Sequence, residues 1–374
     1  MADDLVERLS VKCPSVTLTS ANRRWVWRIL GLGVPAAVLS AAIATAVLWW
    51  RDRPLADIEG QLERPDGAQR ALEAADAFLA RNPASDRALA LKARALAGLG
   101  RWDEASQIFS QVGVRSPQEM RSWATALVHE RRFSEAMPLL ERLLESEPDD
   151  PAALRQVVAC RFQMGLTAAA LESAERLGRI DGHEVEGLFL AGVIHRARGT
   201  TNVALENWAR IEALRSDGQG LAIGPAEFFL IYGEDLLLEG LPQTAAAKLK
   251  RSRDLEDSLA VQLALGKAWA LSGRAAEAAA AWQRALEHDA GNAEARNGLA
   301  ELALSGGDAN EALAWLEPLA DHPHISSTTA YLLERVYTLL GNEDELERWQ
   351  GRTAELRQRE KRVAAFRRRL GVGL

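Results

Sequence analysis

Histidine and carboxylate side chains that lie close together in the sequence are the first candidates for catalysis or metal binding. His129 and Glu130 begin the HExxH pattern of zinc proteases, but its second histidine is missing. Asp321, His322 and His324 carry groups that bind metals, yet short polar loops between helices often have this composition. We therefore predict no metal site and no bound cofactor.

Other signatures of catalysis are missing from the sequence as well. It contains no GxxxxGKS/T phosphate loop and no GxSxG nucleophile motif. Gly31 and Gly33 lack both the GxGxxG spacing and a preceding strand, so they indicate no dinucleotide site. Acidic pairs such as Asp149 and Asp150 fall where helices are expected to begin, and there they cap the helix. We expect that the chain is not an enzyme.

Composition and charge narrow the class of protein. Of 374 residues, 48% are hydrophobic and only 6% aromatic, and alanine and leucine dominate, which favours helices over strands. The formal net charge of -7 argues against a general nucleic-acid binder, whose surface would be basic. Cys13 and Cys160 form no CxxC motif and lie on opposite sides of a long apolar segment, so they indicate neither a disulfide nor a metal site.

That apolar segment is a run of 22 uncharged residues, 29–50. As a helix it would be about 33 Å long, enough to cross a hydrocarbon core of about 30 Å. Tryptophans at both ends suit the two membrane interfaces: Trp25 and Trp27, then Trp49 and Trp50. A cleaved signal peptide would have a shorter apolar stretch. We predict a short tail over 1–24 and a transmembrane helix over 25–50.

Charges and small residues at this segment bear on its orientation and packing. Five Lys and Arg precede the segment and four follow within 20 residues, a slight excess that favours a cytoplasmic tail and a large domain outside. Small residues form two neighbouring ridges, Ala36, Ser40 and Ala44, then Ala37, Ala41 and Thr45. Because small residues let helices approach closely in lipid, we predict that the span packs on itself or on a partner helix. An alanine-rich span without a partner would show the same pattern.

A self-similar frame runs through the rest of the chain. The strings GRWDEASQIF, RRFSEAMPLL, GRAAEAAAAW and GGDANEALAW each hold a turn residue, polar residues, a fixed alanine, and a large apolar residue four positions later. The alanine recurs at steps of 34, 31, 34, 34, 41, 33 and 34 residues, and Leu346 takes its place one further step of 34 along. Its positions are Ala71, Ala105, Ala136, Ala170, Ala204, Ala245, Ala278 and Ala312.

This pattern resembles the tetratricopeptide repeat, a pair of antiparallel helices that stacks on its neighbours. The family's small residue of the first helix falls on Ala93, Ala124, Gly192, Gly233, Gly266 and Ala300. Its turn glycine falls on Gly100, Gly165, Gly199, Gly240, Gly273, Gly307 and Gly341, and its closing proline on Pro83, Pro117 and Pro148. The resemblance implies an all-α, right-handed superhelical solenoid of about nine hairpins over residues 51–351, preceded by one transmembrane helix.

Departures from the repeat pattern occur at a few places. Lys92 and Arg161 occupy positions that are usually apolar, and Glu334 replaces a small residue. The 41-residue step holds the string RSDGQGLAIGP, residues 215–225, which indicates a longer loop between the fifth and sixth hairpins, or a flexible joint. Residues 352–374 carry eight Lys or Arg and two Glu. We expect a basic capping helix there, or a surface helix that touches anionic lipid or an acidic partner.

The resemblance also implies a concave groove, lined by the first helices, in which partner peptides or helices would bind. Residues expected to face it are Arg87, Arg94, Arg121 and Arg155 in the earlier hairpins, and Glu186, Glu227, Glu234, Lys267, Glu294, Asn297 and Glu301 in the later ones. Clustered arginines would hold the carboxylates of an acidic peptide. The same residues would also fit polar positions that are merely solvated.

A membrane helix followed by such repeats is similar in layout to bacterial envelope assembly factors, which implies the inner membrane of a bacterium with the repeats outside the cytoplasm. We predict a membrane-anchored scaffold or adaptor that binds partner proteins in its groove. The alternative is a stoichiometric structural subunit of a membrane complex, held mainly through its span. The expected partners are proteins and membrane lipid, not nucleic acid, and homo-oligomers through the span remain open.

Overall fold

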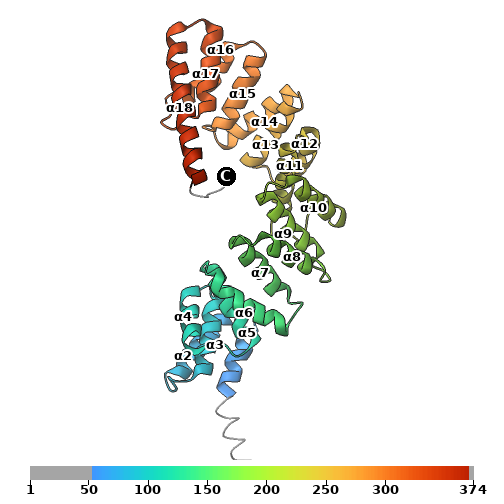
Figure 1. Ribbon diagram of the computed structural model, residues 1–374, viewed down its shortest axis with the longest axis vertical. Helices are drawn as coiled ribbons and strands as arrows, with labels where there is room; N and C mark the ends of the chain where they lie inside the picture. Colours follow the sequence, from blue (N-terminus) through green and yellow to red (C-terminus); the bar gives the residue numbers. More distant parts are fainter. Residues whose placement is uncertain (1–52, 370–374) are drawn as a thin grey trace, which may run out of the picture. The chain divides into compact units, whose positions relative to one another are not determined.

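The computed structural model of the chain describes residues 53–369, all of them in helices, turns and loops (Figure 1). The tail over 1–24 and the span over 25–50, with Ala37, Ser40, Ala41 and Ala44, lie outside these residues. Among the residues that the structure does describe, no helix has the length and apolar character needed to cross a membrane.

The chain divides into two compact units, Met1–Leu139 and Leu140–Leu374. The first contains a helix over 53–62, then α2 (Ala68–Leu79), α3 (Asp86–Gly98), α4 (Trp102–Val112) and α5 (Pro117–His129). The boundary between the units falls inside α6 (Phe133–Ser146).

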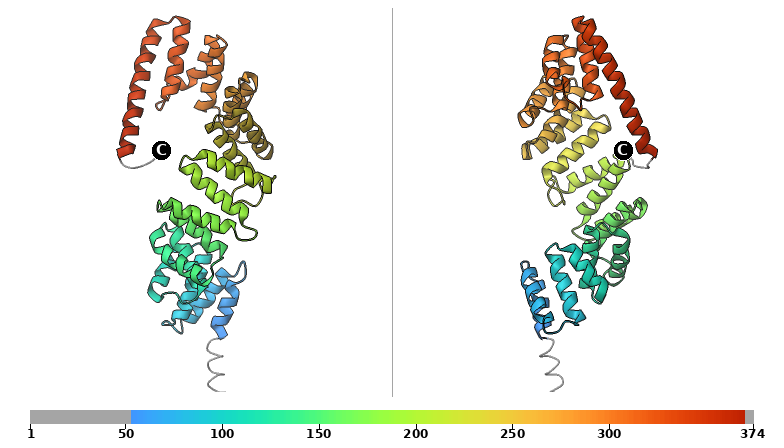
Figure 2. Two further views of the ribbon diagram at one scale, coloured as in Figure 1. Left: turned by 45° about the vertical axis from the view of Figure 1, so that its right-hand side comes forward. Right: turned by 90° about the vertical axis from the view of Figure 1, so that its left-hand side faces the viewer.

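The second unit continues with paired helices up to a long final one. These are α7 (Pro151–Gln163), α8 (Thr167–Gly178), α9 (Glu184–Ala197), α10 (Thr201–Leu214), α11 (Pro225–Leu238), α12 (Pro242–Leu255), α13 (Leu259–Leu271), α14 (Ala275–His288), α15 (Ala293–Ser305), α16 (Ala309–Ala320), α17 (Ser327–Leu340) and α18 (Glu343–Arg369). Consecutive helices pack against each other, as the two views of Figure 2 show. The all-α hairpin architecture is therefore confirmed within each unit.

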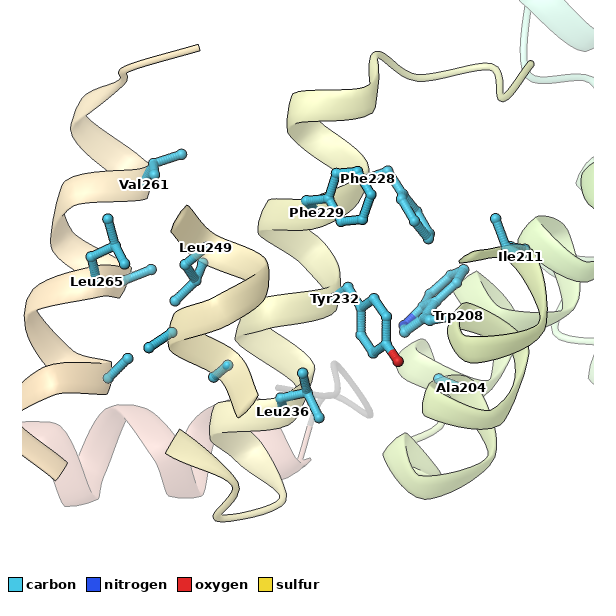
Figure 3. Packing of buried hydrophobic residues seen from close by; sticks show 14 of the residues in the cluster. Ala204, Trp208, Ile211, Phe228, Phe229, Tyr232, Leu236, Leu249, Val261 and Leu265 are labelled. Carbon is cyan, nitrogen blue, oxygen red and sulfur yellow. The ribbon is translucent and has the colours of Figure 1, made fainter. Parts of the chain in front are cut away.

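The repeat frame marks the positions where hairpins touch. All eight frame alanines are fully buried, and so are the large residues Phe109, Leu140, Trp208, Leu249 and Leu316, each four positions after its alanine. An alanine at each of these points lets the second helix of a hairpin lie close to the first, while the large residue fills the space towards the next layer. Figure 3 shows one such layer, where Trp208 lies against Phe228 near Ala204.

Two glycines enclose one tryptophan in the second unit. A Cβ atom on Gly266 of α13 would lie 2.2 Å from Nε1 of Trp282, and one on Gly298 of α15 would lie 2.6 Å from the same indole. Neither helix could carry a larger residue there without moving, so α14 is held between α13 and α15 by its indole. Within the described residues, the Nε1 atom of Trp282 has no hydrogen-bond partner.

Seven glycines predicted to end the first helices all have positive φ, between 66° and 83°. The third hairpin breaks this pattern, because Arg131 takes the corresponding position with a φ of 61°. Residues with a Cβ atom are strained in that region, so this turn has a higher conformational free energy than the turns made with glycine. The repeat frame places a turn at RRF, although its turn position holds an arginine instead of a glycine.

The short step of 31 residues arises at a proline with two functions. Pro117 was predicted to close the second hairpin, and the structure places it at the first position of α5. Ser116 caps this helix and forms a capping box with Glu119. Pro117 therefore also opens the third hairpin, which shortens the chain between two frame alanines by three residues relative to the usual step.

The longer step of 41 residues forms a loop between α10 and α11, at the predicted place. Its Leu221 and Ile223 pack on the core of the second unit, and Gly218 is buried against Phe228 and Phe229. Arg251 donates a hydrogen bond to the Ser216 carbonyl. These contacts fasten the loop to the helices on both sides of it.

Polar partners accommodate two of the departures from the repeat pattern. Nζ of Lys92 lies 2.7 Å from Oδ1 of Asp76 on the neighbouring helix. Nη1 of Arg161 donates to Oγ of the buried Ser173 at 2.7 Å. Lys92 therefore ends on an acceptor of the preceding hairpin, whereas Arg161 ends on an acceptor of the second helix in its own hairpin.

The terminal helix is continuous, and the domain boundary expected at Arg352 falls inside it. Trp349, Thr353 and Leu356 are buried along one stripe of α18. The stripe packs on α17, whose Ser327 donates to Glu360 at 2.8 Å. This half of α18 covers the last apolar face of the array, as a capping helix does.

Candidate functional site

A hollow of about 350 Å³ lies on the first unit and collects three arginines. It is lined by Leu62, Arg64, Pro65, Ala68, Arg94, Ala97, Gly98, Trp102, Arg121, Ser122 and Thr125, and no carboxylate is among these residues. Its wall is made by the ends of the helix over 53–62 and α2 together with α3, α4 and α5. Two of the predicted groove residues, Arg94 and Arg121, thus share one hollow.

Close packing of the helices sets the floor of this hollow. Gly98 ends α3 where a Cβ atom would lie 3.1 Å from Cβ of Ala68. Because both residues are small, the turn before α2 and the end of α3 come close together, and Arg64 is brought to the same opening as Arg94. Arg64 is exposed and makes no ion pair with any residue that the structure describes.

The other arginines of this face already have contacts. Glu59 lies 3.5 Å from Arg94 and 3.5 Å from Arg87, and its own side chain remains 44% exposed. Arg94 is largely covered, with 13% of its side chain exposed, while Arg121 is half-buried. The two contacts of Glu59 are long and open to water, so they hold the arginines weakly and an incoming carboxylate can compete with them.

An aromatic pair closes one side of the hollow. The rings of Trp102 and His129 stack with centroids 4.2 Å apart and planes within 2° of each other. Trp102 is the first residue of α4 and His129 the last of α5, so the stack joins two hairpins at their turns. The indole gives the hollow an apolar wall beside its guanidinium groups, which suits a peptide that carries both acidic and apolar side chains.

In the second unit, Arg155 is engaged by a groove carboxylate. Its guanidinium donates to both carboxylate oxygens of Glu186, one of them at 3.1 Å, and Nδ1 of His183 lies 2.9 Å from the same carboxylate. Partial burial acts to raise the pKa of Glu186, but the hydrogen bonds from Arg155 and His183 outweigh it, so the pKa is lowered. These predicted groove residues therefore bind each other across the α7–α9 layer.

Glu234 belongs to a network that the sequence analysis did not find. Arg196 donates to Glu234 and to the buried Asp235, each at 2.7 Å, and Asp235 also accepts from Nε1 of Trp208 at 2.8 Å. The network ties α9, α10 and α11 together across a hairpin boundary. A buried carboxylate with two donors of this kind is a structural element rather than a free ligand group.

The remaining predicted residues lie on the solvent side of their first helices. Glu227 on α11, Lys267 on α13, and Glu294 and Glu301 on α15 are exposed and form no ion pairs with described residues. Asn297 is half-buried, and its Oδ1 atom has no hydrogen-bond partner among the described residues. This face of the second unit is acidic and largely unpartnered.

Elsewhere, the histidines considered as metal ligands show no such grouping. The backbone N–H of His324 donates to Nδ1 of His322 at 3.2 Å, and the two rings are 6.1 Å apart. Among the residues that the structure describes, no cluster of three or more His, Cys, Asp or Glu side chains could hold a metal ion.

Comparison with known proteins agrees with the hairpin geometry. A tetratricopeptide repeat family model matches residues 61–128 and 270–324, one stretch in each unit. These two stretches therefore carry tetratricopeptide repeats. Domains of this type generally serve as scaffolds that bind partner proteins or peptides, and they are typically not enzymes.

One curated relative and two solved structures illustrate the similarity. The chain is 27% identical over 169 residues to Protein CTR9 homolog from Arabidopsis thaliana, which is 42% of this chain but only 15% of that relative. The C-terminal part of a TPR repeat-containing protein from Cytophaga hutchinsonii has a TM-score of 0.51 at 14% identity, covering 63% of this chain and 95% of the other. YrrB, described as a TPR protein with an unusual peptide-binding site, has a TM-score of 0.43 at 14% identity, covering 57% and 97%. The Cytophaga likeness shows the fold alone.

Proposed function

We propose that this protein is a membrane-tethered scaffold that captures an acidic segment of a partner protein in the hollow of its first unit. The observation that carries the proposal is the gathering of Arg64, Arg94 and Arg121 around about 350 Å³ of space lined by no carboxylate. The tether is the uncharged stretch of residues 29–50, which directly precedes the first described helix in the sequence.

The chemistry of the hollow favours carboxylates over other polar groups. A guanidinium presents a planar fork that bonds both oxygens of a carboxylate, and three forks around one opening favour a segment with more than one acidic side chain. Ser122 and Thr125 add hydroxyl groups to the lining, and Trp102 adds an aromatic wall. An extended peptide with acidic residues next to an apolar one would satisfy each of these features.

Charge reversal at the exposed arginine gives the sharpest test. Arg64→Glu should weaken binding of a fluorescent peptide containing three glutamates and a leucine by about two- to fivefold, because one solvent-exposed charge pair is lost and a repulsion replaces it. Arg94→Gln and Arg121→Gln should add to the loss and reduce the dependence of binding on salt. The matched control is Arg70→Glu with Arg81→Glu, two exposed arginines of the first unit outside the hollow.

Equal peptide binding by Arg64→Glu and by the control would place the partner site elsewhere on the molecule. Circular dichroism of each variant separates lost binding from lost folding. Mass spectrometry of proteins that co-purify with the full chain in detergent distinguishes an adaptor from a structural subunit of a complex. Many clients at low ratio indicate an adaptor, and one set of proteins at constant ratio indicates a structural subunit.

A further inference from the structure

The C-terminal part of α18 extends beyond the helix that it caps. Glu360 of α18 accepts a hydrogen bond from Ser327, the first residue of α17. Residues 361–369 continue the helix for more than two further turns (Figure 2). Among the described helices, α18 has extensive contact with α17 alone.

One face of this extension combines positive charge with bare apolar surface. Arg359, Arg362, Val363 and Phe366 follow the spacing of i, i+3, i+4 and i+7, which places them on one side of a helix. Val363 is 45% exposed and Phe366 63% exposed, whereas Trp349 and Leu356 earlier in the same helix are buried. An exposed phenylalanine between arginines serves no capping purpose.

The basic extension would be more stable as a helix if an acidic surface lay against it. Residues 357–374 carry seven Lys or Arg and one Glu, so like charges lie three and four positions apart along the extension. Such pairs repel each other and destabilise a solvated helix. Part of the repulsion is offset because basic side chains at a helix C-terminus interact favourably with its dipole. A negatively charged surface against the extension would remove the rest.

The same chain offers that surface. Residues 140–356 carry 35 Asp or Glu against 20 Lys or Arg. On the first helices of the second unit, Glu227, Glu294 and Glu301 are exposed without ion pairs to described residues. Two exposed leucines accompany them at the ends of α11 and α13, where Leu238 is 68% and Leu271 59% exposed. We call this surface, formed by α11, α13 and α15, the acidic face.

We propose that the extension of α18 docks on the acidic face of a second copy of this chain, with Arg359 and Arg362 against Glu294 and Glu301 and with Phe366 against the exposed leucines. The extension continues straight from a helix packed on α17, so it does not turn back onto its own acidic face. Exchange between two copies is reciprocal, because each provides one extension and one acidic face, and a two-fold symmetric pair results. The proposal is independent of the arginine hollow, which lies in the other unit.

Cysteine cross-linking between two differently labelled copies tests this arrangement. Full-length chains in detergent, each with Cys13→Ser, would carry either Phe366→Cys or Leu271→Cys and be mixed before mild oxidation. A disulfide-linked heterodimer is the expected product. The control uses Lys250→Cys in place of Leu271→Cys. Lys250 is exposed on α12, the second helix of its hairpin, and α12 is not part of the acidic face. Association through the predicted span would affect both mixtures equally.

Charge reversal adds a second, specific criterion. Arg359→Glu with Arg362→Glu should lower the cross-linked yield about three- to tenfold, and Glu294→Arg with Glu301→Arg in the other copy should restore it. Cross-linking no greater than in the Lys250→Cys control, or unchanged by reversal, would overturn the proposal. So would a polarity-sensitive dye at Phe366→Cys that responds to anionic but not zwitterionic nanodiscs without any cross-link, since the extension would then bind lipid.

Discussion

At the scale of single residues, the arginine hollow depends on one carboxylate that competes with any ligand. Glu59 reaches Arg87 and Arg94 at 3.5 Å each, from a helix turn directly beside the opening. Its position means that Arg94 of the hollow is partly neutralised when no partner is present. Both arginines were predictable from the sequence but Glu59 was not, because contacts between neighbouring hairpins do not appear in a repeat pattern.

Removing this competitor should strengthen binding of an acidic peptide. Glu59→Gln is expected to raise the affinity by about two- to fivefold, since an exposed ion pair no longer has to be broken. Fluorescence anisotropy at low and moderate salt would measure the change, with Glu63→Gln as the control at an exposed carboxylate near the same helix end. A lower affinity in Glu59→Gln would show instead that Glu59 orients the arginines.

Cys160 provides a residue-scale probe of folding. Its side chain is fully buried in α7, and burial raises the pKa of the thiol to about 11. Since the thiolate is the reactive form, a maleimide at pH 7 should label Cys160 only after the second unit unfolds. In a Cys13→Ser background, labelling in urea should therefore follow the loss of helical signal, and fast labelling of the native protein would contradict the burial.

At the scale of helices, contact between hairpins decides which glycines can be replaced. Gly298→Ala would push a methyl group into Trp282 and should lower the free energy of unfolding by about 1–3 kcal/mol, as overpacking does. Gly351→Ala in α18 meets nothing within 4 Å and should raise it by up to about 1 kcal/mol, because alanine favours helix. Urea unfolding followed by circular dichroism compares the two, and a stable Gly298→Ala variant would mean that the indole can move.

Much of the arrangement of helices into pairs was predictable from the sequence. The frame alanines and turn glycines mark a helix pair wherever they recur, since their small size and positive φ are direct requirements of the backbone. Arg131 and Pro117 were less predictable, because there a turn is made without glycine and a proline opens a helix instead of only closing one. Side-chain partners between hairpins, such as Asp235 for Arg196, depend on tertiary contacts that no spacing specifies.

At the scale of the whole molecule, the candidate site depends on which side of a membrane the repeats occupy. The basic excess before the uncharged segment favours a topology with residues 52–374 outside the cytoplasm. Alkaline phosphatase fused after Leu374 should then be active, and a reporter that requires the cytoplasm should be inactive at the same position. The opposite pair of results would reverse the topology and make partners cytoplasmic.

The network of Arg196, Asp235 and Trp208 has a consequence for engineering the array. Repeat proteins are often shortened by excising one repeat, because each contacts only its neighbours. Here, excision of residues 185–225 would remove the guanidinium and the indole while leaving Asp235 buried in α11 without its two donors. Excision of residues 259–292, between two hairpins that share no such carboxylate among the described contacts, should leave a foldable chain. The hairpins of this array are therefore not interchangeable. A hairpin can be removed only where no buried carboxylate depends on donors from the excised helices.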